Sequence, residues 1–105
     1  MAGIIERNAR DHATIRQRND IVDGKDVWSD VQCRCFCIDF EQSDKEYFGA
    51  IQNGKIFMVA PLETDPHLPG MLLHNGREYE IRGIRTYRNM NGILLGYRIA
   101  VAGAS

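Results

Sequence analysis

Three cysteines are the most reactive side chains of this sequence, and they occupy alternate positions, Cys33, Cys35 and Cys37, in the run CRCFC. Residues two apart on a β-strand point to the same face but lie too far apart for an unstrained disulfide. A structural metal site would need a second group of ligands at a defined spacing, and the histidines are scattered along the chain. We therefore expect reduced cysteines packed on a buried strand face, with no metal and no other cofactor. A disulfide between subunits remains the open alternative.

Carboxylates are densest between Asp39 and Glu46, where the chain reads DFEQSDKE. Charged side chains in such a run are usually solvated, because burying an unpaired carboxylate is costly. The sequence has neither a serine in a nucleophile-elbow motif nor a glycine-rich phosphate-binding loop. We therefore expect no catalytic residue and no enzymatic activity, and we interpret residues 41–54 as an exposed loop and turn.

Arginine and tyrosine residues alternate through the last third of the chain, a combination with which small β-barrels stack single-stranded nucleic acid. The whole chain nevertheless has 13 Lys plus Arg against 14 Asp plus Glu, and this net charge of −1 lacks the basic surplus of a nucleic-acid-binding protein. Tyr79 and Tyr97 share the apolar phase of their strands, which predicts that both belong to the core. Arg82 and Arg98 lie on the other face and are candidates for a subunit interface.

A long hairpin over residues 75–102 must position these side chains. Apolar residues occupy every second position from Ile93 to Val101, the pattern of a strand with one buried face. In the first half of the hairpin the apolar phase slips by one residue at Gly83, which indicates a β-bulge. Asn91–Gly92 joins the halves and predicts a type I′ turn, because both residues tolerate a positive φ.

Shorter strands precede this hairpin and are separated by turn signals. The segments 12–18, 31–40 and 55–60 have strand patterns, and Asp23–Gly24, Asn53–Gly54 and Asn75–Gly76 are turn signals. The strand 31–40 is apolar on both faces in its second half, so other elements should wrap it. The 105 residues are predicted to form one all-β domain, a small SH3-like β-barrel of antiparallel strands with long loops. Residues 1–11 form an N-terminal arm or a short helix in this interpretation.

Taken in order, these segments resemble the head–tail joining proteins of tailed bacteriophages, also called head-closure, stopper or neck proteins. The similarity covers residues 12–102. It comprises an early strand ATIRQR, a Gly-then-Trp connection from Asp23–Gly24 to Trp28, a strand from Val31 to Ile38, a polar excursion, and the ending NGREYEIRGI followed by a turn and a final strand. The run CRCFC and the proline-containing segment 61–70 depart from the family pattern.

The resemblance implies a structural protein of the virion neck, present as a homo-oligomeric ring of about six or twelve copies. Such a ring joins the DNA-filled head to the tail and helps to close the DNA channel. Its partners would be other copies of the chain, a portal or adaptor protein above, a tail protein below, and genomic DNA that passes without sequence-specific binding. During assembly it would lie in the host cytoplasm.

The family's channel loop maps onto residues 41–54, where carboxylates would repel the phosphates of passing DNA. The channel-loop candidates are Glu41, Gln42, Ser43, Asp44, Lys45 and Glu46, and the interface candidates are Ile4, Ile5, Arg82 and Arg98. Two alternatives stand beside this interpretation. One is a tail-completion or tail-terminator protein of the same virion region, and the other is a non-viral small β-barrel module that binds nucleic acid or peptide. No membrane is expected as a partner, since no apolar run approaches the roughly 18 residues of a spanning helix.

Overall fold

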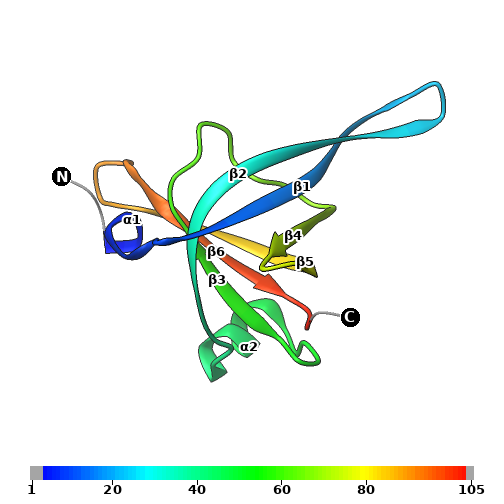
Figure 1. The fold of residues 1–105 in the computed structure, drawn as a ribbon. Helices are drawn as coiled ribbons and strands as arrows, with labels where there is room; N and C mark the ends of the chain where they lie inside the picture. The colour runs from blue at the N-terminus through cyan, green and yellow to red at the C-terminus, as the bar shows by residue number, and fades with distance from the viewer. Residues whose placement is uncertain (1–3, 104–105) are drawn as a thin grey trace.

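The computed structural model describes residues 4–103, without the side chains of residues 4, 6 and 19–22. Within this range, six antiparallel strands close into a barrel in the order β1-β2-β3-β6-β5-β4, and two short helices lie outside it (Figure 1). The elements are α1 (Ile4–Asn8), β1 (Asp11–Val22), β2 (Lys25–Asp39), α2 (Gln42–Phe48), β3 (Lys55–Val59), β4 (Gly70–His74), β5 (Arg77–Arg88) and β6 (Leu94–Val101). The prediction of a small antiparallel β-barrel is confirmed. Neither helix of the described residues is long and apolar enough to cross a membrane.

Tight turns join two of the neighbouring strand pairs. Asp23 and Gly24 (φ 52° and 75°) join β1 to β2, and Asn75 and Gly76 (φ 51° and 76°) join β4 to β5, so that both turns have the two positive φ angles of type I′. These two turn predictions are confirmed.

The turn between β5 and β6 differs from the prediction. Of Asn91 and Gly92, only Gly92 has a positive φ (79°), so a type I′ turn at this pair is wrong. The Gly92 N–H instead donates to the carbonyl of Asn89 at 3.0 Å. The side-chain oxygen of Asn89 accepts hydrogen bonds from the N–H groups of Asn91 (2.8 Å) and Ile93 (3.0 Å). Asn89 therefore organises a longer loop, because its carboxamide replaces main-chain partners.

The barrel interior holds the main core. Tyr79 (4% exposed) and Tyr97 (0%) both point into it, as predicted, together with the first two cysteines. Cys37, by contrast, is exposed, so its predicted burial is wrong. Pairing of β1 with β2 reaches only to Cys35, and Cys37 lies beyond the last residue that β1 covers. The core comprises Ala13, Ile15, Cys33, Cys35, Phe57, Val59, Leu72, Tyr79, Ile81, Tyr97, Ile99 and Val101.

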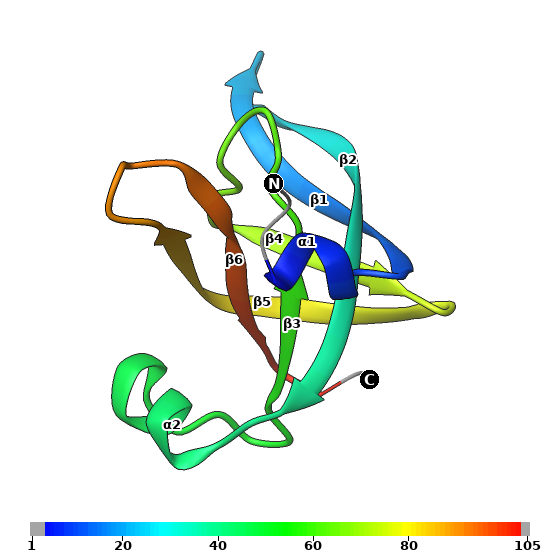
Figure 2. The ribbon, with the colours of Figure 1, turned by 90° about the vertical axis from the view of Figure 1, so that its left-hand side faces the viewer.

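A second apolar cluster lies on the outer wall of the barrel, under the two helices. Figure 2 shows α1 in front of β3 and β2, with α2 near the lower end of the same wall. Because β2 contributes Phe36 and Ile38 to this cluster, it is apolar on both faces, and the prediction that other elements wrap it is confirmed. The cluster comprises Ile5, Ile56, Met58 and Ala100, with Phe36, Ile38, Phe40, Phe48, Ile51 and Tyr87 packed against them.

Residues 42–48 form helix α2, so the prediction of a loop there is wrong. A capping box begins the helix: the Glu41 side chain accepts the Asp44 N–H, and the Glu41 N–H donates to Asp44 Oδ2 at 2.9 Å. Gly49 (φ 86°) ends it, with its N–H bonded to the Lys45 carbonyl at 2.9 Å. A helix of seven residues is about two turns long, too short for an apolar period to be visible in the sequence.

The predicted bulge at Gly83 is confirmed, and it has a packing role. The register of β5 against β6 shifts between Ile81 and Gly83. A Cβ atom at position 83 would lie 2.5 Å from Cδ1 of Phe48, closer than two carbon atoms can approach. Only glycine therefore lets the Phe48 ring of α2 pack against β5 at this point.

Candidate functional site

The predicted channel loop, residues 41–54, begins with the N-cap residue Glu41 and contains the whole of α2. Its six candidate residues, from Glu41 to Glu46, are exposed except for Asp44, which is 2% exposed. The helix therefore presents Glu41 and Glu46 outward and turns one carboxylate toward the barrel.

The buried carboxylate of Asp44 pairs with Arg98 of β6. Arg98 Nη2 donates to Asp44 Oδ2 at 2.7 Å, and Arg98 Nε donates to Oδ1. The side chains are only 3% and 15% exposed for Asp44 and Arg98, respectively. The hydrogen bond from Arg98 lowers the pKa of Asp44, and the same bond raises the pKa of Arg98. Asp44, predicted to line the channel, and Arg98, predicted as a subunit contact, thus form an internal ion pair that leaves little of either side chain exposed.

A cation–π stack also joins α2 to the barrel. The guanidinium carbon of Arg85 lies 4.6 Å from the centre of the Tyr47 ring and 5.1 Å from that of Tyr87. One face of each ring is therefore occupied by Arg85. With Tyr79 and Tyr97 in the core, the tyrosines of the C-terminal hairpin do not form an open row of rings on which bases could stack.

The remaining interface candidates have different surroundings. Ile5, predicted as a subunit contact, is 9% exposed and packs in the second cluster of the protomer. Arg82 is accessible, with its side chain 52% exposed and its Nε 3.4 Å from Glu80 Oε1. The side chain of Ile4 lies outside the described residues.

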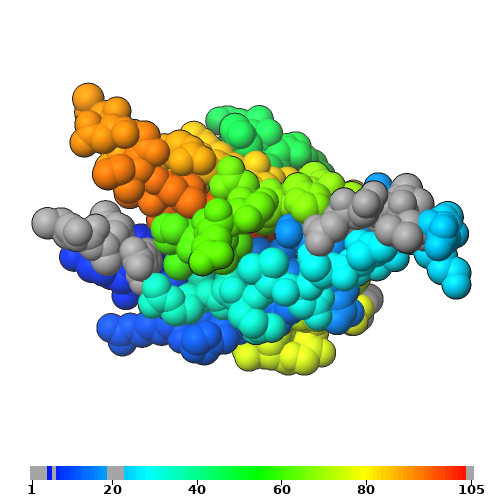
Figure 3. Space-filling model, turned by 90° about the horizontal axis from the view of Figure 1, so that it is seen from above, coloured from blue at the N-terminus to red at the C-terminus, as the bar shows by residue number. Residues whose placement is uncertain are grey.

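The segment between β3 and β4 is fixed across one end of the barrel. The Tyr97 hydroxyl donates to Asp65 Oδ1 at 2.6 Å, and burial together with this bond raises the pKa of Tyr97 to about 12. A second hydrogen bond ties the segment to β1: the N–H of His67 donates to Oε1 of the buried Gln17 at 3.2 Å. Figure 3 shows this segment alongside β2 on the upper surface.

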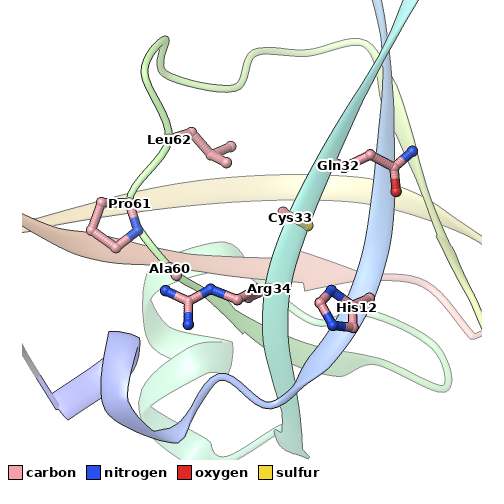
Figure 4. Close-up of a pocket in the computed structure, with 7 residues that line it drawn as sticks. All are labelled: His12, Gln32, Cys33, Arg34, Ala60, Pro61 and Leu62. Atoms are coloured by element: carbon pink, nitrogen blue, oxygen red, sulfur yellow. The ribbon is translucent and has the colours of Figure 1, made fainter.

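A hollow lies between β2 and the start of this segment (Figure 4). Its volume is about 200 Å³, and it adjoins a second, wider hollow of about 380 Å³ with which it shares Gln32, Pro61 and Leu62. We refer to the first as the β2–loop hollow. It is lined by His12, Gln32, Cys33, Arg34, Ala60, Pro61 and Leu62.

A two-stranded arm, residues 18–30, extends from the barrel. The strands β1 and β2 pair as far as Val22 and Lys25, but β4 pairs with β1 only over Thr14–Gln17 and β3 pairs with β2 only from Cys35 onward. At its base, the Arg18 N–H donates to the Pro69 carbonyl at 3.2 Å, and beyond this point the ribbon projects from the barrel, as Figure 1 shows. Its surface exposes Val27 (40%) and Trp28 (45%).

Sequence reasoning did not identify the arm as a site. The signal was a single tryptophan within the polar run DGKDVWSD, where a buried strand would have shown several apolar neighbours. The length of the arm depends on where β3 and β4 stop pairing with β2 and β1. A single sequence does not specify these end points.

Among the residues that the structure describes, no three His, Cys, Asp or Glu side chains group as a metal-binding set. Comparison of the chain with known protein families and with curated proteins finds no match. Three surfaces of the described residues are candidates for binding a partner: the arm, the β2–loop hollow and the outer face of α2.

Proposed function

We propose that this chain is a structural protein of the neck of a tailed bacteriophage, where copies of it form a ring that joins the DNA-filled head to the tail and helps to close the DNA channel. The observation that carries the proposal is the arm, a ribbon of β1 and β2 that extends past the pairing of β3 and β4 and exposes a tryptophan outside a closed barrel. A projecting ribbon of this kind is a surface for contacts with other proteins.

The resemblance to head–tail joining proteins supports the same function. Its Gly-then-Trp connection coincides with the arm, in which Asp23–Gly24 is the tip and Trp28 lies on β2. Its NGREYEI motif coincides with the β4–β5 turn and the start of β5. The partners in this proposal are further copies of the chain, a portal or adaptor protein on the head side, and a tail protein on the tail side. The chain would assemble in the host cytoplasm and then lie in the virion neck.

In this proposal α2 replaces the channel loop. Its exposed carboxylates, Glu41 and Glu46, repel the phosphates of passing DNA, so the genome moves through without sequence-specific binding. Asp44 contributes no such charge, because Arg98 neutralises it. Its role is to hold the helix against β6.

The experiment uses DNA-filled heads from a phage that lacks this gene, isolated tails and the purified chain. We expect the chain to sediment with the heads and to restore infectious particles when it is added before the tails. A chain that binds neither heads nor tails, and restores no infectivity, would contradict the proposal. Binding to isolated tails alone would instead support the tail-completion alternative.

A non-viral binding module is the second candidate, and the accessible Tyr47 beside Arg85 favours it (Tyr47 is 56% exposed). Such a module would bind oligonucleotides more tightly at low salt, because binding releases counterions. Absence of binding to single-stranded oligonucleotides at low ionic strength would remove this candidate for nucleic acid.

A further inference from the structure

Trp28 is 45% exposed on the arm, and it belongs to neither apolar cluster of the protomer. We propose that Trp28 of one copy inserts into the β2–loop hollow of a second copy of this chain. Tryptophan is enriched among the residues that anchor protein interfaces, where it fills pockets in the partner. The contact would remove from water a ring that the single chain leaves accessible.

The β2–loop hollow has the composition that an indole ring requires. Ala60 and Cys33 are buried at its base, and Pro61 and Leu62 form an apolar wall. The N–H of a buried indole also needs an acceptor. The main chain of β2 can supply one at Gln32. The carbonyl of Arg34 faces β3, where it accepts the Ala60 N–H at 2.9 Å, and main-chain groups two residues along a strand face the same side. The carbonyl of Gln32 therefore faces the hollow, where β2 has no strand neighbour among the described residues.

The protomer cannot make this contact by itself. Trp28 and Cys33 lie on the same extended strand, and five residues at about 3.3 Å each keep them about 17 Å apart. An arm that projects beyond its own barrel can reach the hollow of a neighbouring copy, whereas it cannot fold back onto its own.

Charge complementarity favours a second copy as the occupant. The segment 19–27 of the arm contains three aspartates and one lysine, a formal charge of −2. The hollow is lined by His12 and Arg34, and exposed Arg10 precedes His12 in the chain. Asp11, the acidic residue between them, lies instead 3.5 Å from His74. An acidic arm and a basic rim on the same chain steer copies into a head-to-tail arrangement.

The anchor and the hollow are different patches of one surface, so the contact is heterologous. Repeated contacts of this type close into a ring or continue as a filament. Closure of these contacts into a ring rests on the proposed neck function. The contact between two copies can be tested by itself, without heads or tails.

Trp28 is the only tryptophan of the chain, so its fluorescence reports the contact directly. We expect the purified chain to associate with increasing concentration in sedimentation velocity. In parallel, the Trp28 emission should shift to shorter wavelength and acrylamide quenching should fall. A chain that remains monomeric, or one that associates with unchanged Trp28 emission and quenching, would overturn the inference.

Two variants with a matched control locate the contact. Trp28→Ala should weaken association about 30-fold or more, the loss expected for an interface hot spot. Gln32→Glu keeps the oxygen that accepts the Thr14 hydroxyl (3.2 Å) and adds a negative charge to a residue that lines the hollow. It should weaken association about two- to fivefold, less so at high salt. Gln52→Glu adds the same charge at another exposed position and should have no effect. Equal effects of the two glutamate substitutions would contradict the assigned hollow.

Failure of this inference is distinguishable from failure of the proposed function. If Trp28→Ala still binds heads and restores infectivity with the wild-type concentration dependence, the ring forms through another contact and the inference is wrong. If the wild-type chain associates through Trp28 but binds no heads, the contact stands and the neck function is wrong.

Discussion

The Asp44–Arg98 pair should dominate the stability of α2 on the barrel, and Asp44→Asn is the substitution that tests it. The asparagine has the same shape but removes the negative charge between Arg98 and the Glu41 N–H. Breaking one side of a buried ion pair costs about 3–5 kcal/mol, because the remaining charge stays buried. Arg98 retains 15% exposure, so partial hydration favours the lower limit, about 3 kcal/mol. For a domain of this size, that lowers Tm by roughly 12–24 °C.

The pH dependence of stability should identify the same carboxylate. The folded-state pKa of Asp44 is lowered by its hydrogen bond with Arg98, so its stabilising contribution is fully present above the unfolded pKa of about 3.9. That contribution is lost as the pH falls through the lower, folded pKa. We therefore expect the difference in unfolding free energy between wild type and Asp44→Asn to be constant from neutral pH to about pH 5 and to shrink in stronger acid.

Urea unfolding at several pH values measures the loss of stability in Asp44→Asn and its dependence on pH. Hydrogen exchange shows which part of the protein is destabilised. Amides of α2 should exchange faster in Asp44→Asn, while those of β6 should change less. Glu46→Gln removes an exposed carboxylate from the same helix and should shift stability by less than about 0.5 kcal/mol. If Asp44→Asn costs as little as this control, or if its cost is the same at pH 2 as at pH 7, the ion pair does not hold α2.

Two further predictions address packing and thiol reactivity. Gly83→Ala should destabilise the protein by about 1–3 kcal/mol in urea unfolding, because the new Cβ would lie 2.5 Å from Phe48 Cδ1; unchanged stability would mean that Phe48 does not pack there. A disulfide-exchange reagent at pH 8 should modify one thiol per native chain, at Cys37, and three in urea. Burial raises the pKa of Cys33 to about 11 and of Cys35 to about 12, and the thiolate is the reacting form. Rapid modification of two or three native thiols would contradict the packing of β2.

The features that sequence reasoning predicted correctly are those encoded over a few neighbouring residues. The alternation around Tyr97 identified the buried face of β6, the phase slip identified the bulge at Gly83, and Asp23–Gly24 and Asn75–Gly76 identified tight turns. Asn91–Gly92 shows the limit of this reasoning. The same dipeptide joins two strands through a different loop, because the Asn89 side chain supplies the hydrogen bonds.

By itself, then, the sequence determined a barrel of antiparallel strands and the inward face of its C-terminal hairpin, since side-chain alternation and turn chemistry are local properties. Tertiary structure decided the functional surfaces. Asp44 and Arg98 are 54 residues apart, and only the packing of α2 on β6 converts a carboxylate in a polar run and an arginine on a strand into one ion pair. The same holds for the arm. Trp28 projects because β3 and β4 stop pairing before they reach it, and such an end of pairing is set by the whole sheet.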